Sequence, residues 1–141
     1  MTCTADLYRR WGIAWIVMAL AIGLHVADEA LNDFLPMYNA TVEWLRERYG
    51  WAPPAFSFSA WLSGLTLGVV VLLALSPLVF AGNLIFRPLS YGLGILMTAN
   101  ALGHAGASIY MAAPAPGVYS SPVLLAAALY LLISVHKARR R

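Results

Sequence analysis

Long apolar windows separated by shorter polar stretches dominate the pattern of the chain. They cover about residues 11–31, 59–80, 90–110 and 120–136, and the last has the shortest continuous apolar run. A helix needs about 20 residues to cross a hydrocarbon layer of roughly 30 Å, and a stretch such as GVVVLLAL does not alternate as a barrel strand would. The pattern therefore predicts an all-α protein, a bundle of four transmembrane helices that forms a single integral membrane domain over residues 1–141.

The segment between the first two windows is long and contains a short helical pattern of its own. Residues 41–49, TVEWLRERY, mix apolar and charged positions before Pro53 and Pro54 break the pattern. Trp44 and Tyr49 are of the type that lies among lipid headgroups. We expect a short amphipathic helix at the membrane interface, which serves as an anchor or as a lid over a pocket.

Composition and charge placement agree with a membrane protein. The chain has 61% apolar residues, 11% charged residues and a mean hydropathy of +0.73. Of its nine Lys and Arg residues, seven fall on the face that holds both termini and the second loop: Arg9, Arg10, Arg87, Lys137, Arg139, Arg140 and Arg141. The positive-inside rule places that face in the cytoplasm, and we expect a multi-pass protein of a bacterial inner membrane.

The sequence also limits which partners the protein can have and predicts how closely its helices pack. The basic residues have no aromatic or glycine-rich reading surface beside them, so the expected partner is membrane lipid and not nucleic acid. The single cysteine, Cys3, excludes an intramolecular disulfide, and the oligomeric state stays open. Small residues recur every fourth position in two windows, which predicts closely packed helices: Gly64 and Gly68, and Ala99, Gly103 and Ala107.

One stretch of the first window, LHVADEAL, contains three ionisable residues. The apolar run from Trp11 to Leu24 has only fourteen residues, about 21 Å at 1.5 Å per residue, so the helix must continue to about Leu31 to cross the membrane. An unpaired charge there costs at least about 2.5 to 3.5 kcal/mol. At about 100 degrees per residue, four side chains share one helix face within a 100-degree arc: His25, Asp28, Glu29 and Asn32.

The third window carries a matching polar stripe, Asn100, His104 and Ser108. His25 lies fourteen residues after Trp11, and His104 lies fourteen residues after Ser90, so the two histidines are predicted at the same depth. The second window has a polar stripe in the same half of the membrane, of which Ser63 is the central member. Intramembrane ionisable groups mark functional sites by default, so we expect one polar site in the outer half.

Two imidazoles and two carboxylates suit a zinc or iron ion better than a soft metal. We expect His25, Glu29 and His104 as ligands, with Asp28 as a fourth ligand or as the general base, and all four as active-site residues. The residues expected to orient them are Asn32, Asn100, Ser108 and Ser63. The favoured function is a metal-dependent hydrolase or oxidoreductase that acts on a lipid-like or other apolar small molecule.

Other classes of protein stay open at this point. His25 and His104 at equal depth suit the axial positions of one b-type haem, although the nearby carboxylates would repel its propionates. A metal-free isomerase would use Asp28 or Glu29 as general base and the histidines as proton shuttles. A proton-coupled transporter also places acids in the membrane, but the chain shows no inverted repeat.

The sequence resembles the small membrane proteins named for their HXXEE motif. The resemblance rests on His25-x-x-Asp28-Glu29, on Asn100-x-x-x-His104, and on the run PGVYS from Pro116 to Ser120 before an apolar helix. Asp28 departs from the motif, which has Glu at that position. The family is regarded as enzymes, and the resemblance implies His25, Asp28, Glu29 and His104 as active-site residues without implying a substrate.

Overall fold

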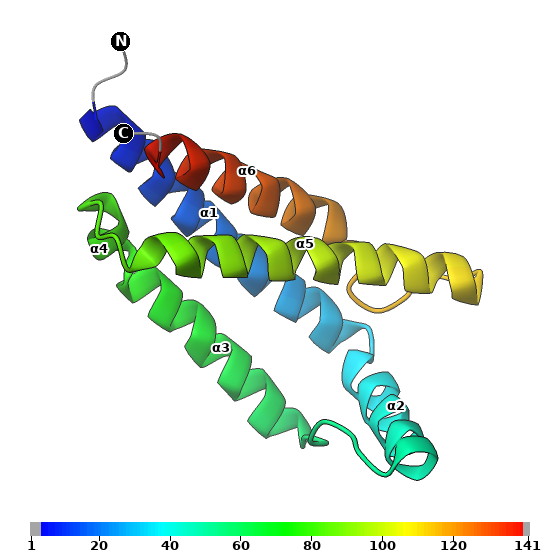
Figure 1. The fold of residues 1–141 in the computed structure, drawn as a ribbon. Helices are drawn as coiled ribbons and strands as arrows, with labels where there is room; N and C mark the ends of the chain where they lie inside the picture. Colours follow the sequence, from blue (N-terminus) through cyan, green and yellow to red (C-terminus); the bar gives the residue numbers. More distant parts are fainter. Residues whose placement is uncertain (1–3, 140–141) are drawn as a thin grey trace.

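The structure, a computed structural model, describes residues 4–139, and all regular structure in that range is helical. Its helices are α1 (Thr4–Leu31), α2 (Phe34–Tyr49), α3 (Phe58–Ala74), α4 (Ser76–Phe80), α5 (Phe86–Met111) and α6 (Ser121–Arg139) (Figure 1). The predicted all-α class is confirmed for these residues. Cys3, Arg140 and Arg141 lie outside the described range.

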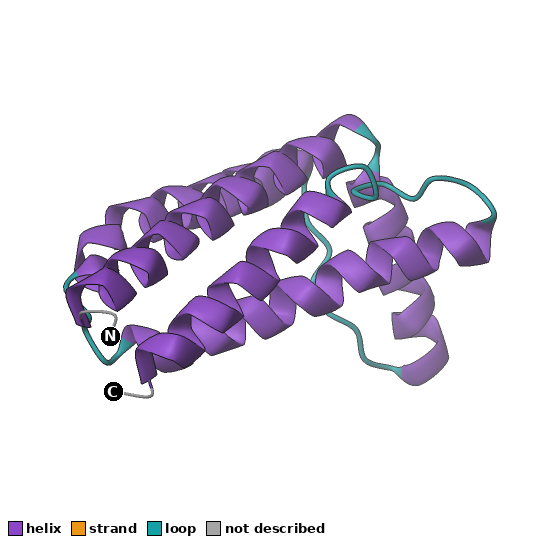
Figure 2. Ribbon diagram, turned by 90° about the horizontal axis from the view of Figure 1, so that it is seen from above, coloured by secondary structure: helices purple, strands orange, loops and turns teal. Residues whose placement is uncertain are grey.

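Helix α1 is the centre of the fold. It packs against α6 and α5 packs on α6, while α3 and α4 lie along another side of α1. The view in Figure 2 shows the longer loops at the end of the molecule away from the start of α1 and the end of α6. These two ends therefore lie together, and the polar residues near Leu31 lie at the opposite end.

Two tryptophans of α1 connect it to its neighbours. Trp11 and Trp15 are fully buried. The indole N–H of Trp11 donates to Ser90 Oγ on α5 at 2.9 Å, and that of Trp15 donates to the Leu72 carbonyl at 2.7 Å. That carbonyl belongs to the last turn of α3, where helix carbonyls have no partner within the helix. The indoles thus provide hydrogen bonds to the Ser90 hydroxyl and the Leu72 carbonyl, which apolar core side chains could not provide.

Three helical stretches are long and apolar enough to cross a membrane: Thr4–Leu31, Phe58–Phe80 and Ser121–Arg139. Helix α5 has 26 residues but does not reach the same hydropathy, so the four-span bundle is shown only as far as these three stretches. In Phe58–Phe80, only 6% of the most apolar stretch is buried, against 50% in α1. Most residues of α3 are therefore exposed, and only one side of the helix lies against α1.

Several expectations about local structure need correction. Helix α1 begins at Thr4 and not at residue 11, and α2 begins at Phe34 and not at residue 41. Asp33 adopts a left-handed conformation with φ of 58°, which turns the chain and lets a new helix begin at once. Asn39 then exchanges hydrogen bonds with the backbone of Phe56, so the segment before α3 returns along α2.

The predicted close approach at the small-residue stripes is wrong for the three glycines Gly64, Gly68 and Gly103. A Cβ added at any of them would meet no atom within 4 Å. The reason is that α3 and α5 diverge from their shared end near α4 (Figure 1). Close approach occurs elsewhere, because a Cβ at Gly94 of α5 would lie 2.7 Å from Leu132 of α6.

Candidate metal centre

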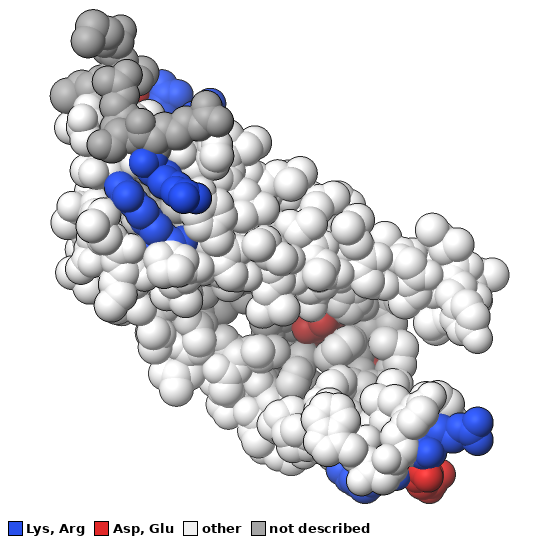
Figure 3. Space-filling model, in the orientation of Figure 1, with Lys and Arg blue, Asp and Glu red and all other residues white. Residues whose placement is uncertain are grey.

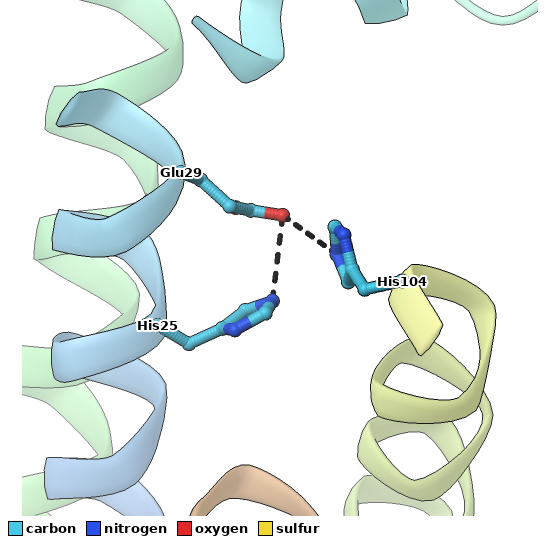
Figure 4. A group of neighbouring side chains, drawn as sticks. All are labelled: His25, Glu29 and His104. Atoms are coloured by element: carbon cyan, nitrogen blue, oxygen red, sulfur yellow. Dashed lines mark ion pairs between the residues drawn. The ribbon is translucent and has the colours of Figure 1, made fainter. Parts of the chain in front are cut away.

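Three side chains from α1 and α5 meet near the end of α1 (Figure 4). His25 and Glu29 lie one turn apart on α1, and His104 comes from α5. Glu29 Oε1 is 3.4 Å from His25 Nε2 and 3.1 Å from His104 Nε2. The two imidazole rings lie edge to face, with their centroids 4.8 Å apart. One carboxylate oxygen is thus shared between two imidazole nitrogens.

The group is closed off from solvent. The exposed fractions are 3% for His25, 5% for Glu29 and 7% for His104. One donor atom from each residue lies within 4.8 Å of the others, an arrangement that could hold a metal ion. Buried ionisable groups are costly unless they are paired or bind a metal, and here Glu29 is paired with both histidines.

A serine that the ligand prediction did not include fixes the orientation of His25. Ser120 Oγ lies 2.8 Å from His25 Nδ1. The Ser120 hydroxyl and the Ser120 backbone N–H also donate to Asp28 Oδ2, at 2.7 Å and 2.8 Å. A hydroxyl has one hydrogen, so a hydroxyl that donates to Asp28 accepts from the Nδ1–H of His25. That tautomer leaves a lone pair on Nε2, the atom that faces Glu29 and His104.

The loop between α5 and α6 packs directly on both imidazole rings. Gly117 has φ of +83°, and a Cβ there would lie 2.8 Å from His104 Cε1 and 3.0 Å from His25 Cε1. Ser108 Oγ donates to the His104 carbonyl and accepts from the Ala115 N–H, both at 2.9 Å. Only glycine fits at position 117, because the backbone is left-handed and the histidines occupy the space of a side chain.

The remaining predicted residues take different places. Asp28 lies beside the metal-ligand group and is bonded to Ser120 and to the Asn32 side-chain amide, the latter at 2.8 Å. Asn100 has a buried Oδ1 without a hydrogen-bond partner and makes no hydrogen bond to His104. Ser63 lies outside the site, because it is exposed on α3 and donates to the Ser59 carbonyl of its own helix.

Ser120 and Gly117 are the residues whose roles the sequence did not reveal. Both belong to the Pro- and Gly-rich return before α6, a composition that predicts a tight turn. A glycine and a serine in such a turn are ordinary turn residues. Their contact with the histidines becomes visible only when the loop is placed over the end of α1.

The donor set could hold a metal ion, with all three donor atoms within 4.8 Å of one another. Zinc binds His nitrogens and carboxylate oxygens at about 2.0–2.2 Å, which puts neighbouring donors of a tetrahedral site roughly 3.3 Å apart. The observed separations from Glu29 Oε1 are 3.1 Å and 3.4 Å. His25 Nε2 is also a buried nitrogen without a hydrogen-bond partner, as a position awaiting a metal would be. No family model, curated protein or solved structure matches the chain.

Proposed function

We propose that this protein is a membrane-embedded metalloenzyme in which His25, Glu29 and His104 bind one divalent ion, zinc or iron. The observation that carries the proposal is the convergence of the three buried donors from two helices, with the Nε2 of His25 lacking a hydrogen-bond partner. The reaction proposed is hydrolysis or oxidation of a lipid-like or other apolar molecule. We also propose that the protein is related to the HXXEE proteins, which it resembles in its motif residues.

Three protein ligands are the number that supports catalysis. Structural zinc sites use four protein ligands, while catalytic sites use three and keep a position for water or substrate. A metal in such a site supplies a Lewis acid and a water activated near neutral pH. The chain itself supplies the orientation of the ligands, because Asp28 holds Ser120 and Ser120 holds His25. Asp28 is thus proposed as a positioning residue, in place of a fourth ligand or a base.

The other classes are less well supported by the geometry. Both Nε2 atoms face one oxygen of Glu29, which occupies the space between the rings where a haem iron would have to lie. A metal-free isomerase or a proton-coupled transporter would use the same carboxylate for proton transfer, since it lies within reach of both imidazoles. That interpretation gives no role to the second buried imidazole beyond its ion pair with Glu29 at 3.4 Å.

We further propose that α5 is a fourth membrane-crossing helix. The start of α1 and the end of α6 lie at the same end of the molecule (Figure 1), which requires an even number of crossings. Three stretches have the hydropathy of membrane spans, so α5 provides the remaining crossing. Its lower hydropathy follows from its polar stripe, which faces the site at His104. Cytoplasmic termini complete the proposal, supported by the placement of basic residues.

Elemental analysis of protein purified without chelators, combined with an optical spectrum, tests the function. We expect one zinc or iron per chain without a Soret band, loss of the metal in His104→Ala, and full metal in the control His136→Ala. His136 is an exposed histidine of α6. Comparing the two variants therefore shows whether metal is lost with the site or with any histidine. A Soret band, or no metal at all in the wild-type protein, would overturn the metalloenzyme proposal.

A further inference from the structure

A pocket opens beside Glu29 at the end of α1. Its volume is about 240 Å³, and α2 and the start of α3 form its other walls. Figure 3 shows a hollow in this part of the molecule with acidic atoms at its bottom. Its lining includes Glu29, Asp33, Phe34, Asn39, Phe56 and Trp61. Glu29, a residue of the candidate metal centre, is therefore part of the wall of this pocket.

A second pocket adjoins the first and leads along α3. It has a volume of about 350 Å³ and shares Phe34, Phe56 and Trp61 with the first. It continues past Gly64 and Leu65, which lie on the outward surface of α3. Because α3 belongs to a stretch with the hydropathy of a membrane span, this second pocket opens toward lipid.

Aromatic rings join the two pockets to the metal centre. The ring centroid of Phe34 lies 6.0 Å from that of Trp61 and 5.8 Å from that of His104. Such separations are those of interacting aromatic pairs. Phe34 is thus in contact with the wall of the pocket on one side and with a proposed metal ligand on the other.

The polar groups of the inner pocket restrict the charge of a ligand. They are Glu29, Asp33 and Asn39, and none of the lining residues is Lys or Arg. The Asn39 amide already bonds the Phe56 backbone, so the two acidic residues are the remaining polar members of the lining. In the metal-free protein, a phosphate or carboxylate headgroup would find no cationic partner among the lining side chains. An uncharged oxygen-bearing group, such as an ester or alcohol, meets no such repulsion.

We propose that the two pockets form one binding site for an uncharged amphiphile that enters from the bilayer between α2 and α3. Its polar group lies beside Glu29, and its apolar chain lies along Phe34, Trp61 and Gly64. The inference rests on the proposed function for the role of the polar group at the metal. By contrast, the groove between α1 and α6, about 510 Å³, is lined by apolar residues and Tyr130 and offers no comparable polar end.

Photolabelling in phosphatidylcholine nanodiscs tests the site. The probe is a monoacylglycerol with a diazirine in its acyl chain, and the labelled residues are identified by mass spectrometry. Gly64→Trp fills the second pocket, and Gly68→Trp places the same side chain one turn further along α3, outside the pocket. Both glycines have free space around an added Cβ. We expect labelling at Phe34 and Trp61 to fall about tenfold in Gly64→Trp and to stay unchanged in Gly68→Trp.

The charge preference is tested on protein stripped of metal by a chelator, with the corresponding diazirine fatty acid at a pH where its carboxylate is ionised. We expect this anionic probe to label the pocket less than the monoacylglycerol. Equal labelling by both probes, an equal effect of the two tryptophan variants, or labelling only at the α1–α6 groove would overturn the inference. Metal content measured on the samples labelled with the monoacylglycerol shows which of the two proposals fails, the metalloenzyme or the amphiphile site. Bound metal without pocket labelling overturns only this inference, and pocket labelling without metal overturns only the metalloenzyme.

Discussion

Replacing Gly117 with alanine tests the packing of the α5–α6 loop on the metal centre. Gly117 has φ of +83°, and an added Cβ would lie 2.8 Å from His104 Cε1 and 3.0 Å from His25 Cε1. Gly50, at the end of α2, has φ of +69° and no atom within 4 Å of an added Cβ. Gly50→Ala therefore shares the backbone cost of Gly117→Ala without the collision with the histidines.

The backbone cost and the collision with the histidines set the expected losses of stability and of metal affinity. A left-handed conformation costs a residue other than glycine about 1–2 kcal/mol, so both variants should lose a similar amount of stability from the backbone. Carbon atoms in ordinary contact lie about 3.5–4.0 Å apart, so the rings beside the new methyl group of Gly117→Ala must move by at least about 0.5 Å. Metal sites tolerate deviations of only about 0.2 Å in ligand distances. Disturbing the support of ligands typically lowers metal affinity about 10–100-fold.

The assay is competition for zinc against a chromophoric chelator, combined with thermal unfolding of the metal-free protein followed by tryptophan fluorescence. We expect both variants to melt at lower temperature than the wild type. Only Gly117→Ala should lose zinc affinity, by about 10–100-fold. Wild-type zinc affinity in Gly117→Ala, or an equal loss in Gly50→Ala, would refute the contact between the loop and the ligands.

Further substitutions separate the roles of individual side chains. Ser120→Ala should lower zinc affinity about tenfold in the same competition assay, because His25 loses the partner of its Nδ1, and Ser63→Ala should have no effect. Glu29→Gln keeps the shape of the side chain but removes the anionic donor, so elemental analysis should find no metal, whereas Glu43→Gln on exposed α2 should retain it. Trp11→Phe leaves a buried serine hydroxyl of α5 unpaired and should cost about 1–3 kcal/mol of stability, seen as a lower melting temperature. An unchanged melting temperature would contradict that role.

The sequence was most informative where helix periodicity alone fixes geometry. Four-residue spacing puts His25 and Glu29 on one face of α1, and their donor atoms lie 3.4 Å apart. Equal residue counts from Trp11 and Ser90, the starts of the apolar windows, predicted His104 at the depth of His25. The rings lie 4.8 Å apart, although α1 begins at Thr4 and α5 at Phe86. Both arguments need only the rise and the turn of a helix, which do not depend on tertiary packing.

Features that depend on how helices and loops lie against one another were not predictable in this way. Ser120 bonds Asp28 across 92 positions of the chain, and nothing in the local sequence indicates that pairing. Ser63 was predicted at the depth of the site, but a predicted depth does not tell whether α3 turns that face toward α1. Similarly, the early start of α2 depends on the left-handed conformation of Asp33. A glycine or asparagine at that position would have predicted such a conformation more clearly.

The central claim is that two imidazoles from different helices bind the same ion. X-ray absorption spectroscopy of the zinc-loaded protein counts these ligands directly. The account predicts two imidazole nitrogens at about 2.0–2.1 Å from the zinc, and one fewer imidazole, or no bound zinc, in His104→Ala. A wild-type spectrum without imidazole ligands, or an unchanged imidazole count in His104→Ala, would contradict it.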